Sequence, residues 1–245
     1  MNSRRGAFHS IRFLKGLRVG VVLLYLSAAA CGSAAVSTLT PPSLDAAAIF
    51  AKAAQSFESL ESFSFRLTHG GGGTPITGGL EVEVAEGVVL NPDRAQVNIE
   101  AVVGGGFVRV KMITIGDDVY LTNPFTGKFE LLSTSDAPTG FFDPSGGVGA
   151  IMTDTKEASL IGQEEVEGTL TFHVTGNIDS SALQSITGSA IEGSPIQAHV
   201  WIGTEDFLVR RITLTGRITA DEKDGITRTI VLSDFNKPVS IEPPE

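Results

Sequence analysis

The chain has 245 residues, of which 42% are hydrophobic, a single cysteine and a formal net charge of −10 at pH 7. Five of its 18 basic residues and none of its 28 acidic ones precede that cysteine, so the remainder is more acidic than the whole. This charge argues against nucleic acid, which proteins hold mainly through Lys and Arg contacts to phosphate, and against adhesion to anionic lipid by charge. A lone cysteine excludes a disulfide within the chain, so the fold depends on its core.

The first 30 residues predict an export signal. Basic residues are followed by an apolar run from Leu17 to Ala30, and small residues stand directly before Cys31. This order is typical of a secretory signal that is removed from the mature protein. The run is shorter than the ~20 residues that a membrane-spanning helix needs. We therefore expect residues 1–30 to be a signal peptide.

Cys31 and the small residues before it resemble the lipobox of bacterial lipoprotein signals. In such signals the cysteine is acylated, with palmitate among the expected chains, and becomes the first residue of the mature protein. Ala28 departs from the pattern, which has Leu or another branched aliphatic residue at that position. The alternative is an ordinary secretory signal, with cleavage before an incidental cysteine or within Ala34-Ala35. Residues 31–42 then predict a tether that holds the protein at the outer face of the cell membrane.

A helical pattern follows the tether, from Ser43 to about Glu61. Ser43 is a suitable N-cap, and Asp45 lies in the first turn, where an acidic side chain is favourable. Apolar residues recur at helical spacing and form one stripe, at positions Phe50, Ala53, Ala54, Phe57 and Leu60.

From residue 62 onward apolar and polar residues alternate, which predicts β-strands that bury one face. We expect strands at residues 62–68, 80–85, 97–101, 108–112, 118–122, 128–132, 158–164, 169–176, 196–203, 208–216 and 227–235. Turn residues separate them, so consecutive strands should pair as an antiparallel meander. A single sheet of about 10–11 strands must curl strongly into a half-barrel.

Two further segments, residues 142–153 and 179–187, predict short helices. Together with the N-terminal helix they are available to cap the concave apolar face of the sheet. The expected fold is α+β, mostly antiparallel β, in one domain over residues 43–245. A void under the helices would suit an apolar ligand, whereas a filled interior would be a plain core. The residues alone favour the packed core.

If the concave face holds a ligand, the residues that alternate toward it are the candidates for contact. These candidate cavity residues are Phe63, Phe65, Leu67, Leu80, Val82, Val84, Val97, Ile99, Val108, Val110, Met112, Ile212 and Leu214. The candidate lid residues, from the segment around residues 142–153, are Phe141, Phe142, Val148 and Ile151.

Catalytic motifs are absent from the sequence. It has no Gly-x-Ser-x-Gly nucleophile elbow, no His-Glu-x-x-His and no phosphate-binding loop. His173 and His199 are predicted on the solvated face of strands, without metal-ligand spacing. Trp201 points away from Val200 and Ile202, either as an outer-face packing residue or as a rim aromatic. We therefore expect no catalysis, no metal and no cofactor.

Several segments together resemble the mycobacterial-type lipoprotein family that includes LppX, LprA, LprF and LprG. The order and spacing of these segments carry the resemblance, rather than any single motif. They are the N-terminal helix running into Phe63–Leu67, Asp117–Thr122 followed by Phe125–Phe129, Phe142–Val148, Glu167–Gly176, Val200–Gly203, Val209–Ile212 and Leu232–Val239.

The resemblance implies a fold similar to LolA and LolB, a half-open antiparallel barrel closed by helices. It also implies that the domain binds an acylated lipid or glycolipid in a hydrophobic cavity and helps to transport it across the cell envelope, which reverses the preference for a packed core. Expected partners are that lipid, the membrane through the N-terminal anchor and, as a candidate, an envelope transporter, with the protein itself a monomer. The alternative is a structural or interaction lipoprotein of the same fold, with a filled core that binds another envelope protein.

Overall fold

The computed structural model describes residues 44–76, 79–132 and 147–244. The chain divides into two compact units, residues 1–41 and 42–245, and every described residue belongs to the second. The predicted signal peptide, Cys31, the whole tether (residues 31–42) and the candidate lid residues Phe141 and Phe142 lie outside the described residues.

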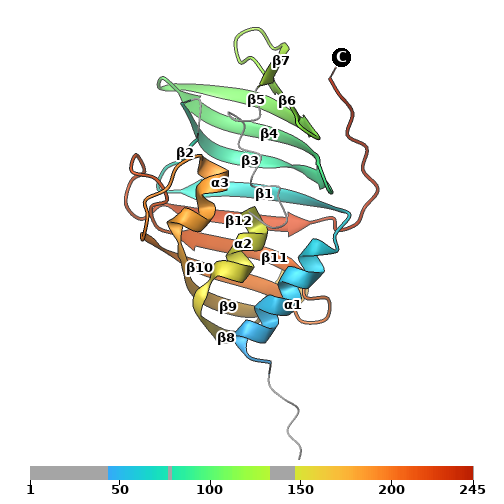
Figure 1. Cartoon of the computed structure of the whole chain (residues 1–245), viewed down its shortest axis with the longest axis vertical. Helices are drawn as coiled ribbons and strands as arrows, with labels where there is room; N and C mark the ends of the chain where they lie inside the picture. The colour runs from blue at the N-terminus through green and yellow to red at the C-terminus, as the bar shows by residue number, and fades with distance from the viewer. Residues whose placement is uncertain (1–43, 77–78, 133–146, 245) are drawn as a thin grey trace, which may run out of the picture. The chain divides into compact units, whose positions relative to one another are not determined.

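Twelve strands form one antiparallel sheet (Figure 1). They are β1 (Ser62–Gly70), β2 (Thr74–Ile76), β3 (Leu80–Leu90), β4 (Arg94–Val103), β5 (Gly106–Ile115), β6 (Asp118–Thr122), β7 (Phe129–Leu132), β8 (Lys156–Val166), β9 (Thr169–Asp179), β10 (Pro195–Gly203), β11 (Val209–Thr215) and β12 (Thr227–Ser233). The sequence did not predict β2, because three residues around Pro75 carry no alternating pattern. The count is therefore one above the expected range.

The prediction of one continuous meander is wrong at two places: the consecutive strands β7 and β8 lie at opposite edges of the sheet, and the first and last strands pair at its centre. The strand order is β7-β6-β5-β4-β3-β1-β12-β11-β10-β9-β8, and β2 pairs with β3 beside this path. The first long strand thus lies between β3 and the last strand, with Phe65 opposite both Gly87 and Leu232. Alternation within a strand indicates which face is buried, but it does not indicate which strand is the neighbour. The β1–β12 pairing could therefore not be predicted from the sequence.

The sheet ends at β7 on one side and at β8 on the other, and among the described residues these two strands do not pair with each other. The mostly antiparallel β fold with few helices agrees with the expected class. Strong curling into a half-barrel stays a prediction.

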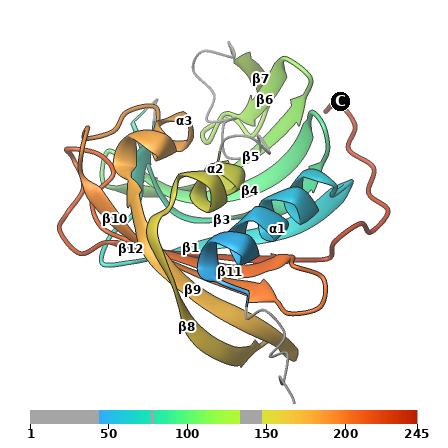
Figure 2. The ribbon, with the colours of Figure 1, turned by 60° about the horizontal axis from the view of Figure 1, so that its bottom comes forward.

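In the part of the chain that the structure describes, four short helical segments lie on one face of the sheet (Figures 1 and 2). They are α1 (Ala46–Glu58), α2 (Gly147–Asp154), the 3₁₀ segment η3 (Ser180–Leu183) and α3 (Gln184–Thr187). The sequence had placed α1 from Ser43 to about Glu61. The helix is shorter because Asp45 is its N-cap, with a carboxylate oxygen that accepts a hydrogen bond of 2.7 Å from the Ala48 backbone N–H.

The two later helical predictions also change at their boundaries. The segment expected at 142–153 is described only from Gly147, where α2 begins. In the segment expected at 179–187, Asp179 is the cap, because its carboxylate accepts a hydrogen bond of 2.9 Å from the Ser181 N–H. Leu183 follows on the buried side and has no exposed surface.

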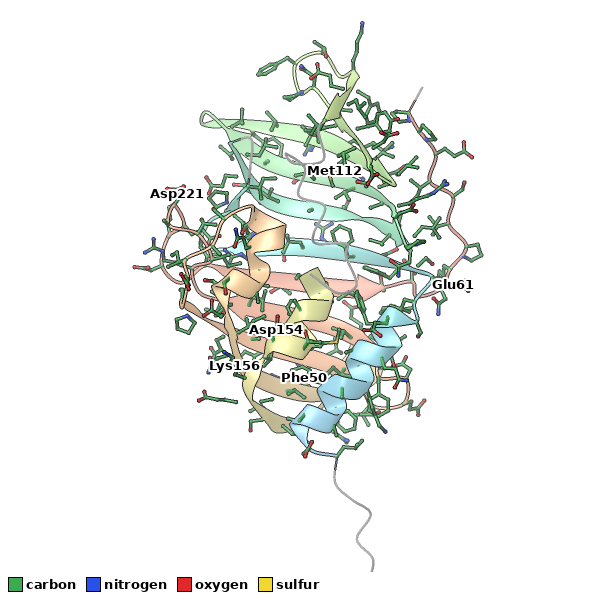
Figure 3. The ribbon with its side chains drawn as sticks, in the orientation of Figure 1. Phe50, Glu61, Met112, Asp154, Lys156 and Asp221 are labelled. Carbon is green, nitrogen blue, oxygen red and sulfur yellow. The ribbon has the colours of Figure 1, made fainter. Side chains whose placement is uncertain are left out.

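The apolar core fills the layer between the sheet and the helices. Phe57 of α1 packs on Phe63 of β1 with ring centroids 5.3 Å apart. Phe50 on α1 and Met112 on β5 are both buried in this layer (Figure 3). Burying each such large apolar side chain contributes about 1.5–3 kcal/mol to stability. Because the helices contact only one face, the opposite face of the sheet carries polar side chains such as Arg66 and Glu86.

Candidate functional site: an apolar pocket beneath η3 and α3

A cavity of ≈ 80 Å³ lies between the sheet and the η3–α3 segment. Most of its lining is apolar and comes from the central strands, with Leu183 and Thr187 contributed by the helical segments. The lining residues are Phe65, Leu67, Thr74, Ile76, Val82, Ala85, Val97, Ile99, Met112, Leu183, Thr187, Leu214, Ile218, Arg228 and Ile230. Among the described residues of the pocket wall, no polar atom is exposed.

Seven of the candidate cavity residues line this pocket. They come from strands that alternate correctly and lie side by side, and they are Phe65, Leu67, Val82, Val97, Ile99, Met112 and Leu214. The strand register explains part of the grouping, since Val97 lies opposite Met112 and Leu67 lies opposite both Ala85 and Ile230. Residues paired across an antiparallel ladder project from the same face, so these side chains converge.

Five other candidate cavity residues face the helix-covered side or the core but do not line the pocket. Phe63 is buried against Phe57 of α1. Ile212 and Val110 are buried in the core, and Leu80 and Val108 are half-buried against it. These residues therefore have the predicted apolar surroundings, but they contact other parts of the core and not the pocket.

The prediction for Val84 is wrong, because a β-bulge reverses its direction. Val82 pairs with Ala101, whereas Val84 pairs with Glu100, so Glu83 is an extra residue on β3. An extra residue in a strand moves all later side chains to the opposite face. Val84 therefore lines a polar hollow on the helix-free face, and Ala85 takes its place in the apolar pocket.

The candidate lid residues on α2 do not line the pocket. Val148 and Ile151 are completely buried in the core. A lid role for these residues, and for Phe141 and Phe142 outside the described residues, stays a prediction. The helical residues that line the pocket are instead Leu183 and Thr187, which the sequence analysis had not assigned to a cavity.

A buried ion pair lies behind the pocket wall, where Arg228 is one of the lining residues. Arg228 of β12 is 4% exposed and Glu222 is 5% exposed, and the guanidinium Nη2 donates to Glu222 Oε1. Arg228 also donates from Nε to Thr74 Oγ1 at 2.7 Å and from Nη1 to the Gly216 carbonyl at 3.0 Å. Each nitrogen of the guanidinium thus has a partner, which satisfies the requirement for burying a charge.

His69 extends this polar network to β3. Its Nδ1 lies 2.8 Å from the Glu83 carbonyl oxygen, which can only accept, so the proton is on Nδ1. Its Nε2 then accepts from the Thr74 hydroxyl at 2.8 Å. Burial lowers the pKa of His69 from 6.5, opposed by the hydrogen bond to Glu83, with Arg228 lowering it further and Glu222 and Glu81 raising it. This network could not be predicted from the sequence, because nothing in the spacing of its members brings them together.

A second cluster lies on the helix-free face, around Trp201. The indole ring stacks on His173 at 4.5 Å and its N–H donates to Glu164, which places Trp201 in packing on the outer face. His173 and His199 lie on this predicted face, but they are half-buried because they pack on Trp201 and are hydrogen-bonded to each other at 2.9 Å. Desolvation lowers the pKa of His173, partly opposed by Glu164 and reinforced by His199. In the described part of the chain, no group of three or more His, Cys, Asp or Glu residues could hold a metal ion.

The family comparison covers nearly the whole domain. The LppX_LprAFG lipoprotein family matches residues 45–241 of this chain. Across residues 44–76, 79–132 and 147–244, we find no helix whose length and apolarity would let it cross a membrane.

Individual relatives match at low identity. The lipoarabinomannan carrier protein LprG of Mycolicibacterium smegmatis is 24% identical over 88% of this chain and 89% of its own length. The LprG of Mycolicibacterium hassiacum is 24% identical over 53% of this chain, and that match spans only 50% of the relative. The crystal structure of LprF from Mycobacterium bovis superposes with a TM-score of 0.64 at 19% identity, covering 81% of this chain and 96% of LprF. At this identity the likeness to LprF establishes a shared fold.

Proposed function

Because this chain belongs to the LppX_LprAFG lipoprotein family, we propose that it is a membrane-anchored lipoprotein that binds an acylated lipid or glycolipid and helps to move it across the cell envelope. The observation that carries this proposal is the pocket beneath η3 and α3, whose described lining residues expose no polar atom. Acylation of Cys31 would hold the pocket at the outer face of the cell membrane, where its ligand originates. The protein would act as a monomer, without catalysis, and would deliver its ligand to an acceptor such as an envelope transporter.

The energetics of transfer favour such a pocket. Each buried CH₂ group contributes about 0.8 kcal/mol, so an acyl chain leaves a bilayer only for a comparably apolar surface. Leu67, Val82 and Met112 supply that kind of surface. The name of the Mycolicibacterium smegmatis relative, a lipoarabinomannan carrier, supports testing lipoglycans as ligands.

The pocket must enlarge to accept a long chain. Its volume of ≈ 80 Å³ is below the ~300–1,000 Å³ of ordinary ligand pockets. The strands that line it are held by backbone hydrogen bonds to their neighbours, whereas Leu183 and Thr187 reach it from short helical segments. We therefore propose that η3 and α3 move away from a half-barrel sheet, like those of LolA and LolB, when a chain enters.

The same small volume favours a second candidate function. If the interior is effectively filled, the protein would be a structural or interaction lipoprotein that binds another envelope protein. Lipid content distinguishes the two candidates. Organic extraction and mass spectrometry of the purified chain, followed by titration with an acyl probe, should give bound lipid or saturable uptake if it is a carrier. Absence of both would eliminate the carrier and leave the interaction lipoprotein.

A further inference from the structure

Arg228 is the one charged side chain among the described residues that line the pocket. A guanidinium at the end of an apolar pocket is a strong site for a carboxylate, because charge-assisted hydrogen bonds strengthen where water is excluded. With no counter-ion, Arg228 would make this pocket a site for the anionic head of a free fatty acid.

Glu222 already occupies that position. One of its carboxylate oxygens, Oε1, accepts from Arg228 Nη2, and the Glu222 side chain has no exposed surface. Its other oxygen accepts from the backbone N–H of Ile218 at 2.6 Å and of Thr219 at 3.4 Å. Both oxygens are therefore held, and the carboxylate is fixed by its own loop. This loop is labelled at Asp221 in Figure 3.

The loop that carries Glu222 also forms part of the pocket wall. Ile218, whose N–H binds Glu222, is itself a lining residue. The Ile218 carbonyl accepts from Ile191 N–H at 2.7 Å, and the Arg217 carbonyl accepts from the Ser194 hydroxyl at 3.1 Å. These bonds join the Glu222 loop to the segment that follows α3. They therefore hold Glu222 at a fixed position relative to the pocket wall.

We propose that Glu222 is an internal counter-ion that reserves the pocket for uncharged acyl chains, such as those of esters and amides, and disfavours free fatty acids. This inference rests on the proposed function and adds the ligand class. A fatty carboxylate that reached Arg228 would lie beside Glu222, and two carboxylates sharing one buried guanidinium repel each other. A chain without a charge meets only the apolar wall and leaves the Glu222–Arg228 pair intact.

Dodecanoate and its methyl ester test this selectivity, because they differ only in the charged head. Equilibrium binding of each is measured at mildly alkaline pH to the full chain, to Glu222→Gln and to Asp224→Asn. The wild type should prefer the ester. Glu222→Gln should shift the ratio of the two affinities toward the acid by about tenfold or more, the change that one charge-assisted hydrogen bond supplies. Asp224→Asn removes the same charge from the same loop at a residue paired with Arg217 at the surface, and should keep the wild-type ratio.

The outcomes separate this inference from the carrier function. Binding of both ligands with a ratio that Glu222→Gln leaves unchanged would overturn the inference and preserve the carrier. Binding of neither ligand to any of the proteins would overturn both. If Glu222→Gln is poorly folded alone, the readout becomes its melting temperature with each ligand. An increase in melting temperature with dodecanoate but not with the ester supports the role of Glu222 as counter-ion. An equal increase with both ligands, or no increase with either, contradicts it.

Discussion

Arg228 Nε donates to Thr74 Oγ1 at 2.7 Å, so the last strand of the sheet is bonded to β2, a strand that pairs with β3 and not with β12. The bond spans the pocket edge and belongs to the same network as Glu222 and His69. Burial of the Arg228 charge is tolerated only while its hydrogen-bond and ion-pair partners are present, so removing one of them should destabilise the fold.

Arg228→Leu should destabilise the protein strongly, because it leaves the carboxylate of Glu222 buried without its cation. We expect a loss of about 3–5 kcal/mol in the free energy of unfolding, measured by chemical denaturation. The double variant Glu222→Leu with Arg228→Leu should lose less than Arg228→Leu alone. The control is Arg109→Ala, which breaks an exposed pair with Glu100 and should cost at most about 1 kcal/mol. Equal losses for Arg228→Leu and Arg109→Ala would contradict the role given to the buried pair.

The stability of the domain should fall with acidification, and His69 should contribute to this fall. Burial lowers the pKa of this histidine, so the unfolded chain takes up a proton at a higher pH than the folded chain. The contribution of neutral His69 is complete above about 6.5, the unfolded pKa, and is lost as the pH falls from there through the folded pKa.

Unfolding free energies measured across this window check the sign of the effect. His69→Gln keeps a donor for the Glu83 carbonyl and an acceptor for the Thr74 hydroxyl without titrating, and should flatten the dependence on pH. His199→Gln is the control on the opposite side of the sheet, because His199 has no contact with Thr74, Glu83 or Arg228. A slope that persists unchanged in His69→Gln would assign the effect to other groups.

Part of this pocket was predictable from alternation alone. Phe65, Leu67 and Met112 line the pocket as the alternating pattern predicted, because a strand with one buried face shows apolar residues at every second position. Val84 was misplaced because a bulge at Glu83 leaves no mark in an otherwise regular alternation. Arg228 and Glu222 were missed because charged residues are read as solvated unless their partner is known, and that partner depends on how a loop folds back.

The bulge provides a matched pair of variants that tests whether the pocket takes acyl chains. Val82→Trp should fill the cavity and reduce uptake of an acyl probe by about tenfold or more, the effect of losing apolar contact for a few CH₂ groups. Val84→Trp adds the same ring on the opposite face of the same strand and should leave uptake unchanged.

The stability of the same two variants bears on the filled-core alternative. If the interior opens for ligand, Val82→Trp should be nearly as stable as the wild type when lipid is absent. If it is packed, overpacking should cost about 1–3 kcal/mol in the free energy of unfolding. Uptake that is equal in Val82→Trp and Val84→Trp would mean that the probe binds somewhere other than beneath η3 and α3.

Acylation of Cys31 is the remaining expectation, and it decides whether the domain acts from a membrane. Cys31 is the only cysteine of the chain, so Cys31→Ala should abolish incorporation of labelled fatty acid in the exporting host and leave the precursor unprocessed. Ala28→Leu supplies the branched aliphatic residue that the signal pattern prefers, and should label at least as well as the wild type. Ser33→Ala lies beyond the cleavage position and serves as the control. Incorporation that survives in Cys31→Ala would contradict the anchor, because this chain has no other thiol to carry the acyl chain.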